Sequence, residues 1–450
     1  MKARYGSWKS PITSDLIVAG TIGVSSPTWH QNELFWIESR PKEEGRNVLV
    51  KQEANGTERD INPPPHNIRT RVHEYGGGAW LLHKGAIYFS NFFDQQIYRQ
   101  FIDESSPNQL TQAEGLRFAD GCVDAKRNRI IYVIEDHTVS GEAENKIGAV
   151  DLDSGEIDIL TSGIDFYAAP VISPDGSKMA FMTWNHPDMP WDETRIWLTS
   201  FDERGRPGKL IHVAGGKQNE RKISVQQPRF SPSGDLYYIS DESGWWNLYK
   251  QGRRKSIYPI DAEFGSPHWG FGLQTYEFIN SKEIVITYAI ANVSKLAVLN
   301  LESVSLENIE IPYTYLSGIS LHEKILVTAA ASPVRFPELI RVDLQNASTS
   351  IIKQSTTLDL DSAYYSVPET IEFPTGNNET AHGFYYPPTN KDYKGLDGET
   401  PPLVVIMHGG PTGATHNVLS LRTQFWTSCG FAVLDVNYCG STGYGRIYRD

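Results

Sequence analysis

The chain has 450 residues, of which 39% are hydrophobic and 21% are charged, as in folded globular proteins and unlike disordered or fibrous ones. A chain of this length exceeds one ordinary hydrophobic core, so we expect two or more structural units. Its net charge of −13 argues against a nucleic-acid partner, because most of the surface would repel a polyanion.

The chain contains only three cysteines, Cys122, Cys429 and Cys439. This odd, sparse set favours a reducing compartment over a disulfide framework, and its spacing does not form a zinc site. The apolar run at residues 16–19 is too short for a signal peptide, and no stretch is long enough to span a membrane. We therefore predict a cytoplasmic protein without a metal, a cofactor or a membrane partner. Whether it forms a homo-oligomer stays open.

A strand-like run rich in Ile, Val, Tyr and Phe recurs between residues 25 and 350, with turn signals between the copies. The seven copies are Glu33–Ile37, Ala86–Ser90, Arg129–Ile134, Lys178–Thr183, Asp235–Ser240, Glu283–Thr287 and Lys324–Thr328. Their spacing of about 40 to 55 residues is typical of propeller blades, and we expect each blade to begin with this strand. Stacked four-stranded sheets would bury faces that a single hairpin leaves open. We predict a seven-bladed β-propeller over residues 25–350, with a β-sandwich or two all-β domains as the alternative.

The pattern changes after residue 350. Residues 351–367 are polar and rich in Ser and Thr, so we expect a linker there, and residues 1–24 are expected to form an N-terminal segment. Residues 368–450 are expected to begin an α/β domain, because strands and a helix alternate. The expected elements are strands at 368–373, 381–386, 403–407 and 431–436 and a helix at 419–429.

The run Leu403–Met407 is apolar without interruption, which is typical of a strand buried on both faces of a parallel sheet. The helix after it has apolar residues at helical spacing, including Leu421, Phe425 and Trp426, and Gly430 is a natural C-terminal stop. Strand, helix and strand together predict a right-handed βαβ unit.

The sharpest local motif is His408-Gly-Gly-Pro411, which ends the apolar run. In acyl transfer the carbonyl oxygen gains negative charge, and backbone N–H groups aimed at it stabilise the transition state. Glycines let the main chain approach a substrate closely, and α/β-hydrolases place such a loop after their third strand. An ordinary glycine turn is the alternative. His408 is not expected to be the catalytic base, which follows the nucleophile late in this topology. We expect His408 to order the loop, with Pro411 in support.

No Gly-x-Ser-x-Gly motif occurs in the 450 residues. The nearest segment, Gly440-Ser-Thr-Gly443, has the wrong spacing and follows a strand as a turn would, so we do not expect Ser441 to be a nucleophile. A zinc peptidase is disfavoured as well, because His-Glu-x-x-His is absent.

Two segments near the C-terminus, His408–Pro411 and Gly430–Gly445, are together similar to the start of the catalytic domain in the prolyl oligopeptidase family. The resemblance looks closest to the acylaminoacyl-peptidase and dipeptidyl-aminopeptidase-like branch. Cys439 departs from the family pattern, which has Arg at this position. Four further phrases also resemble one subfamily of these enzymes: Arg71–Gly78, Trp184–Asp192, Asp241–Tyr249 and Phe264–Gly272.

The resemblance implies a seven-bladed propeller that caps an α/β-hydrolase domain. It implies a serine-type peptidase that hydrolyses short peptides or N-terminal aminoacyl or acylaminoacyl groups through an acyl-enzyme, with the propeller excluding folded proteins. By position, Gly410 would be the oxyanion N–H donor with Gly409 in support. The Ser-Asp-His triad would lie beyond Asp450, so we expect the natural chain to continue.

Two residues of the propeller loops, Glu74 and Trp191, are expected to face the central cavity, where an acid could hold a substrate α-amino group. For Glu74, an ordinary blade turn beside Gly76–Gly78 is the alternative. Two other functions stay open: a non-catalytic propeller that binds partners, and an esterase or amide hydrolase on the same scaffold.

Overall fold

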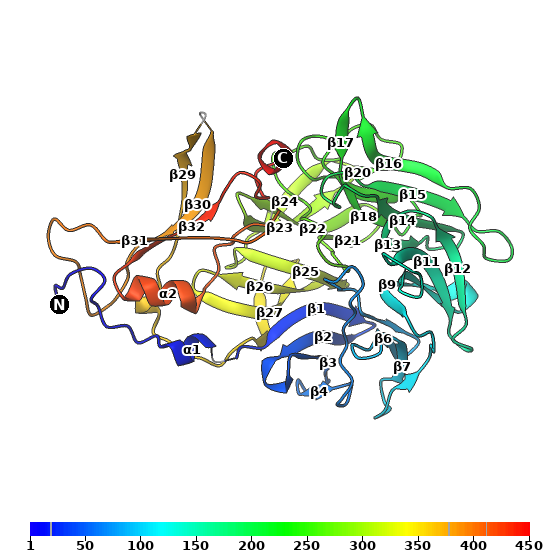
Figure 1. Cartoon of the computed structure of the whole chain (residues 1–450), viewed down its shortest axis with the longest axis horizontal. Helices are drawn as coiled ribbons and strands as arrows, with labels where there is room; N and C mark the ends of the chain where they lie inside the picture. Colours follow the sequence, from blue (N-terminus) through cyan, green and yellow to red (C-terminus); the bar gives the residue numbers. More distant parts are fainter. Residues whose placement is uncertain (19, 377–378, 411) are drawn as a thin grey trace.

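The computed structural model describes residues 1–18, 20–376, 379–410 and 412–450. Eight sheets follow one another along these residues. The first seven are antiparallel and make up the larger part of the molecule, whereas the eighth lies beside α2 at the other end (Figure 1).

The bounds of the elements are as follows. The seven antiparallel sheets contain, in order, β1 (Gly23–His30), β2 (Glu33–Arg40), β3 (Arg46–Gln52) and β4 (Glu58–Asp60); β5 (Trp80–His83), β6 (Ala86–Ser90), β7 (Ile97–Phe101) and β8 (Asn108–Gln109); β9 (Leu116–Asp124), β10 (Arg129–Asp136), β11 (Glu144–Asp151) and β12 (Ile157–Ser162); β13 (Phe166–Ile172), β14 (Lys178–Trp184), β15 (Arg195–Ser200), β16 (Ile211–Gln218) and β17 (Arg221–Ile223); β18 (Val225–Phe230), β19 (Leu236–Ser240) and β20 (Asn247–Lys250); β21 (Tyr276–Phe278), β22 (Glu283–Ile290), β23 (Val293–Asn300) and β24 (Ser305–Ile309); and β25 (Tyr315–His322), β26 (Ile325–Ser332), β27 (Arg335–Asp343) and β28 (Thr349–Gln354). The eighth contains β29 (Glu369–Pro374), β30 (Thr380–Tyr386), β31 (Leu403–Met407) and β32 (Ala432–Asn437). The α-helices are α1 (Ser14–Val18), α2 (Leu421–Ser428) and α3 (Arg446–Arg449), and short 3-10 helices lie at Pro41–Glu43, Ala125–Arg127 and Ser362–Tyr364. None of the helices in the described ranges has the length and apolarity that crossing a membrane requires.

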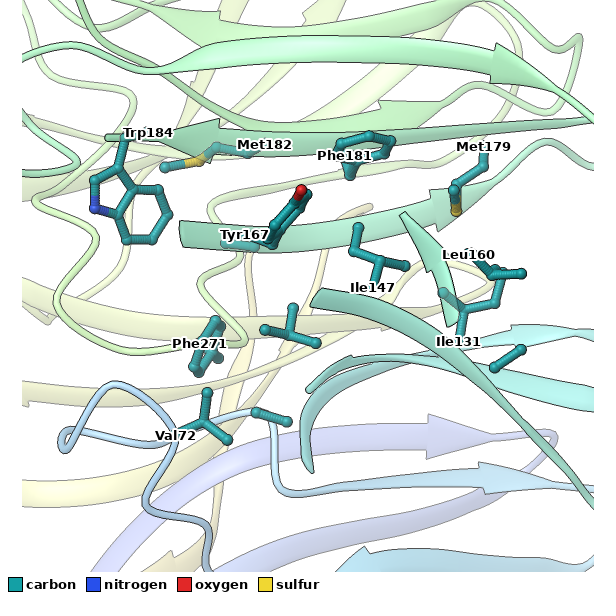
Figure 2. Packing of buried hydrophobic residues seen from close by; sticks show 14 residues of the cluster. Val72, Ile131, Ile147, Leu160, Tyr167, Met179, Phe181, Met182, Trp184 and Phe271 are labelled. Atoms are coloured by element: carbon teal, nitrogen blue, oxygen red, sulfur yellow. The ribbon is translucent and has the colours of Figure 1, made fainter. Parts of the chain in front are cut away.

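Seven hydrophobic clusters hold the antiparallel sheets together, and six of them join two sheets that are adjacent in chain order. The cluster in Figure 2 contains Ile131 of the third sheet and Phe181 of the fourth. Another packs Trp36 of the first sheet against Val327 of the seventh, which closes the ring. Each sheet is thus covered on both faces by its neighbours, which removes apolar surface from water. This closed ring is consistent with the predicted β-propeller.

All seven runs expected from the sequence are strands, but each is the second strand of its sheet and not the first. The second strands are continuous apolar runs because both of their faces are buried, as in β6 and β10. The sequence pattern does not indicate the first strands, because a bulge interrupts the alternation of apolar and polar residues in β1, β9, β13, β18 and β25. Asp120 and Ala169, with φ of 56° and 50°, lie at two of these bulges.

The expected linker at 351–367 begins too early, because residues 351–354 belong to β28. This strand pairs with β27, where Leu339 lies opposite Lys353. Its Ser, Thr and Lys side chains suit the outer strand of a sheet, which needs polar groups on its exposed face.

The N-terminal segment packs against the second unit. Lys2 forms an isolated bridge with Lys394, and the Trp8 ring stacks on Tyr393 with centroids 6.4 Å apart. A Cβ on Gly430, which ends α2 with φ of +93°, would lie 2.8 Å from Trp8. The N-terminal segment therefore helps to build the second unit, which contains the eighth sheet.

The eighth sheet has the order β29-β30-β32-β31, in which β31 and β32 are parallel and α2 connects them. The expected strand–helix–strand unit is therefore present. Burial of β31 on both faces is wrong: Leu403, Val405 and Met407 are 52%, 51% and 65% exposed. β31 lies at the edge of the sheet, and only its other face, with Val404 and Ile406, packs against Trp426 and the cluster around Phe384.

The buried face of α2 is polar and not apolar. Thr423, Gln424, Thr427 and Ser428 are buried, whereas the apolar residues that marked the helix are only half-buried. Gln424 satisfies its amide on the backbone of Ser366, accepting from its N–H at 2.7 Å and donating to its carbonyl at 3.1 Å. Hydrogen bonding to the coil beside the helix offsets the cost of burying these groups.

Candidate active site

The glycine motif directly follows β31, at the edge where β32 also ends. Gly410 has a φ of +79°, a left-handed conformation that favours glycine. Among the described residues, a Cβ on Gly409 would meet no atom within 4 Å, and one on Gly410 would meet Trp269 Cζ2 at 3.9 Å. The backbone at both glycines is therefore open to close approach. Pro411, the expected support of the loop, lies outside the described residues.

Hydrogen bonds hold the carbonyl groups of this loop on the side of His408 and Tyr438. His408 Nδ1 lies 3.2 Å from the Gly409 carbonyl oxygen. The Tyr438 hydroxyl donates to the Gly410 carbonyl oxygen at 2.7 Å, and its ring stacks on His408 with centroids 4.5 Å apart. Since C=O and the following N–H point in opposite directions across a trans peptide, bonding the Gly409 carbonyl directs the Gly410 N–H away from His408.

The N–H groups of Gly409 and Gly410 have no acceptor among the described residues. Two backbone donors, both exposed and held by bonds to the neighbouring carbonyls, are the groups that a developing negative charge requires. The arrangement can therefore bind an oxyanion.

His408 also contacts Ser441, whose Oγ lies 2.7 Å from Nε2. Ser441 is 0% exposed, and its N–H donates to the Tyr438 carbonyl oxygen at 2.9 Å within the expected turn. A serine without exposed surface cannot attack a substrate in this conformation.

A cavity of about 290 Å³ lies between the ring and the second unit. The ring lines it with the segment before β21 and with parts of β22 and β25, and the second unit lines it with Gly413, His416 and Thr442. His416 Nδ1 is buried without a hydrogen-bond partner among the described residues, and burial lowers the pKa of this side chain. The cavity therefore offers an unused polar atom on the side of the glycine loop.

Trp269 connects this cavity to the glycine loop. Its side chain lines the cavity, and its Nε1–H donates to the Thr412 carbonyl oxygen at 2.7 Å. The sequence contains Trp269 in one of the phrases that resemble the family, but no spacing pattern separated it from the other tryptophans. Only the contact with Thr412, which is 143 residues away in the chain, identifies it.

Glu74 and Trp191 do not line this cavity. Glu74 is exposed on the ring, with φ of +63°, and lies 3.4 Å from Arg117. Trp191 is 4% exposed in the hydrophobic cluster between the fifth and sixth sheets, with its ring centroid 4.3 Å from that of Trp269. The structure therefore does not bring these two residues together at the glycine loop, and a substrate-binding role for either one stays a prediction.

Helix α3, next to the chain end marked C in Figure 1, lies against the ring. Arg446 and Arg449 both pair with Asp241, and the three side chains are 7%, 2% and 0% exposed. The Gly445 N–H donates to Glu263 Oε1 at 3.1 Å, and the other Glu263 oxygen accepts from the Trp246 N–H at 3.0 Å. The wall of the cavity is thus part of the joint between the units.

We predict that this joint weakens as the pH rises. Burial raises the pKa of Glu263 to about 7, although the N–H groups of Trp246 and Gly445 oppose the shift. The stabilisation from protonated Glu263 is therefore complete below about pH 4.5, the value of a free glutamate, and is lost as the pH rises through about 7. Between pH 5 and pH 8 the wild type should lose about 2 to 3 kcal/mol more stability than Glu263→Gln. Thermal unfolding of both proteins at each pH measures the difference, and parallel pH curves would contradict it.

No family model matches the chain. The chain is 20% identical over 331 residues to dipeptidyl-peptidase 5 of Schizosaccharomyces pombe, an alignment that covers 73% of this chain and 40% of that protein. The chain therefore spans less than half the length of this curated relative.

Solved structures are similar over the whole chain. A Mycobacterium tuberculosis puromycin-hydrolyzing peptidase has a TM-score of 0.93 at 32% identity, covering 100% of this chain and 71% of that one. A puromycin hydrolase has a TM-score of 0.91 at 31% identity, with the same coverage of 100% and 71%. A prolyl endopeptidase and an acylaminoacyl peptidase share the fold at TM-scores of 0.72 and 0.68.

Proposed function

Because this chain belongs to the prolyl oligopeptidase family of serine peptidases, we propose that it supplies the substrate-gating ring and the oxyanion-binding loop of such an enzyme. The reaction is hydrolysis of short peptides or of N-terminal aminoacyl or acylaminoacyl groups through an acyl-enzyme. The second unit acts as the start of an α/β-hydrolase domain, in which Gly410 donates its N–H to the oxyanion with Gly409 in support.

The observation that carries this proposal is the pair of exposed glycine N–H groups that have no acceptor among the described residues, next to a cavity that the ring partly encloses. Removing one oxyanion donor typically costs about 100- to 1000-fold in rate, so such a loop is a large part of catalysis. The ring limits access to the cavity, which restricts substrates to short chains. The proposal requires a serine nucleophile that the 450 residues do not contain in a Gly-x-Ser-x-Gly elbow.

A fluorophosphonate probe tests the proposal on the protein expressed from its complete coding sequence. We expect one covalent adduct, located by mass spectrometry on a serine in a strand–turn–helix elbow. A folded protein that takes up no probe would overturn the proposal and favour a non-catalytic ring. An adduct on Ser441 would overturn the assignment of roles, because this serine is buried.

Substrate profiling then separates a peptidase from an esterase on the same scaffold. Aminoacyl, acylaminoacyl and dipeptidyl amide reporters are compared with matched esters, and puromycin is included because two of the similar structures carry its name. We expect turnover of the amides. Turnover of the esters alone would assign an esterase.

Trp269→Phe is expected to lower kcat/KM about tenfold, since a misplacement of about 1 Å from a remote change can cost 100-fold. The phenyl ring keeps an aromatic cavity wall, but the hydrogen bond to the Thr412 carbonyl oxygen is lost and the glycine loop gains freedom. Steady-state kinetics on the best reporter measure the effect. Phe93→Leu is the control, because Phe93 is 67% exposed and outside the cavity lining. Equal kinetics of the two variants would remove Trp269 from the site.

The three thiols are free in the structure. We include a cytoplasmic location in the proposal, because a sparse and odd set of cysteines favours a reducing compartment.

A further inference from the structure

We infer that Ser441 is a positioning residue for the oxyanion donor, because its hydroxyl and the Gly409 carbonyl together fix the tautomer of His408, and His408 in turn orients the Gly410 N–H. This inference rests on the proposed function of the glycine loop, and it assigns a task to a serine that the peptidase mechanism does not use as a nucleophile.

The neighbours of the imidazole determine its tautomer. Nδ1 lies 3.2 Å from the Gly409 carbonyl oxygen, which can only accept, so Nδ1 must carry a proton. The neutral ring then has its lone pair on Nε2, and the only donor described there is the Ser441 hydroxyl at 2.7 Å. The Tyr438 hydroxyl, 3.5 Å from Nδ1, does not compete because its proton is used on the Gly410 carbonyl oxygen at 2.7 Å.

These contacts form a chain of hydrogen bonds that runs in one direction. Ser441 donates to His408, His408 donates to the Gly409 carbonyl, and the Gly410 N–H at the far end of that peptide has no acceptor among the described residues. Each bond in such a chain strengthens the next by roughly 10 to 30%. The Gly410 N–H is thus both directed away from His408 and made a better donor.

The turn that presents Ser441 is itself fixed. The Thr442 N–H donates to the Gly413 carbonyl oxygen at 2.8 Å, and Asn292 Nδ2 of the ring donates to the Thr442 carbonyl oxygen at 3.0 Å. A Cβ on Gly443 would lie 2.1 Å from Asn292 Oδ1, so this position admits only glycine without rearrangement. The ring therefore holds Ser441, the first donor in the chain of hydrogen bonds, in place.

A Ser–His pair at 2.7 Å is also the geometry of a nucleophile and its base. Two observations assign Ser441 a positioning role and not that of a nucleophile. Ser441 is 0% exposed, and His408 Nδ1 faces a backbone carbonyl in place of the carboxylate that orients a catalytic base.

The experiment has two readouts. Proton-coupled ¹⁵N spectra of the histidine side chains report which imidazole nitrogen carries the proton, and the His408→Gln spectrum identifies the His408 signals among the 12 histidines. We expect Nδ1–H in the wild type and a mixture of tautomers in Ser441→Ala.

Steady-state kinetics of Ser441→Ala should show kcat about tenfold lower with KM within about twofold, less than the loss of a whole oxyanion donor. Ser428→Ala is the control, because Ser428 is equally buried and hydrogen-bonds to Ser10 far from the loop. It should change neither the spectrum nor kcat.

Each outcome decides the inference. Protonation of wild-type His408 on Nε2 would overturn it, because Nδ1 could then not donate to Gly409. A changed tautomer in Ser441→Ala with unchanged kcat would also overturn it. A wild type that takes up no fluorophosphonate and hydrolyses no reporter would refute the proposed function, whereas the spectra would still decide the tautomer and the role of Ser441 in setting it.

Discussion

Asp241→Asn is expected to cost about 3 to 5 kcal/mol at the joint between the two units, because two buried arginines lose the buried carboxylate that they share. Asp241 is 0% exposed and accepts from Arg446 at 2.7 Å and from Arg449. Its other oxygen accepts from the Ser224 N–H at 2.8 Å. Asparagine has nearly the same shape, so the charge is the property that changes.

Hydrogen exchange of the peptides that contain α3 measures this effect at the joint itself. A loss of 3 kcal/mol or more in local opening free energy corresponds to exchange that is about 100-fold faster or more. Asp450→Asn is the matched control, since Asp450 contacts the same Arg446 at 2.8 Å but is 50% exposed. An exposed pair contributes at most about 1 kcal/mol, so its removal should change the exchange little. Similar effects of the two variants would contradict the buried network.

Gly410→Ala is expected to lower kcat about 100- to 1000-fold, the loss that follows removal of one oxyanion donor. Alanine disfavours the φ of +79° at this position, so the loop relaxes and the N–H turns away from the oxyanion. The new methyl group would meet Trp269 at 3.9 Å, an ordinary contact, so a steric clash does not explain the loss. Kinetics of the protein from its complete coding sequence, on the reporter that the wild type hydrolyses best, measure the effect.

Gly398→Ala controls for backbone strain. Gly398 has a φ of +81°, and its Cβ would have no atom within 4 Å in the part of the chain that the structure describes. The two variants should therefore lose similar stability, by about 1 to 2 kcal/mol. Only Gly410→Ala should lose activity. A Gly398→Ala variant that is equally impaired, or a Gly410→Ala variant with normal kcat, would remove Gly410 from the oxyanion site.

Part of the site could be predicted from local pattern. The position of the glycine motif after Leu403–Met407 followed from an uninterrupted apolar run and a glycine pair, and the structure has both where they were expected. The turn at Ser441 was expected for the same reason. Trp269, Tyr438 and Asp241 were not singled out as functional, because what distinguishes them is a partner in a distant part of the chain.

The sequence by itself determined the elements whose physical cause is local. The second strands of the ring are buried on both faces by adjacent sheets, so the side chains of β6 are apolar from Ala86 to Phe89. Gly430 ends α2 because glycine adopts its φ of +93° at little cost. Repetition of one such strand at regular spacing was enough to predict a ring of sheets.

Only the tertiary structure decided the elements whose partners are remote. The polar face of α2 is buried because the Ser366 backbone bonds to Gln424, and the first strands of the ring are bulged, which removes their period of two. Likewise, the His408 ring lies between the Gly409 carbonyl and the hydroxyl of Ser441, which is 33 residues later in the chain. Hydrogen bonds between distant segments leave no periodic signal in a sequence, since each needs only one polar atom at one position.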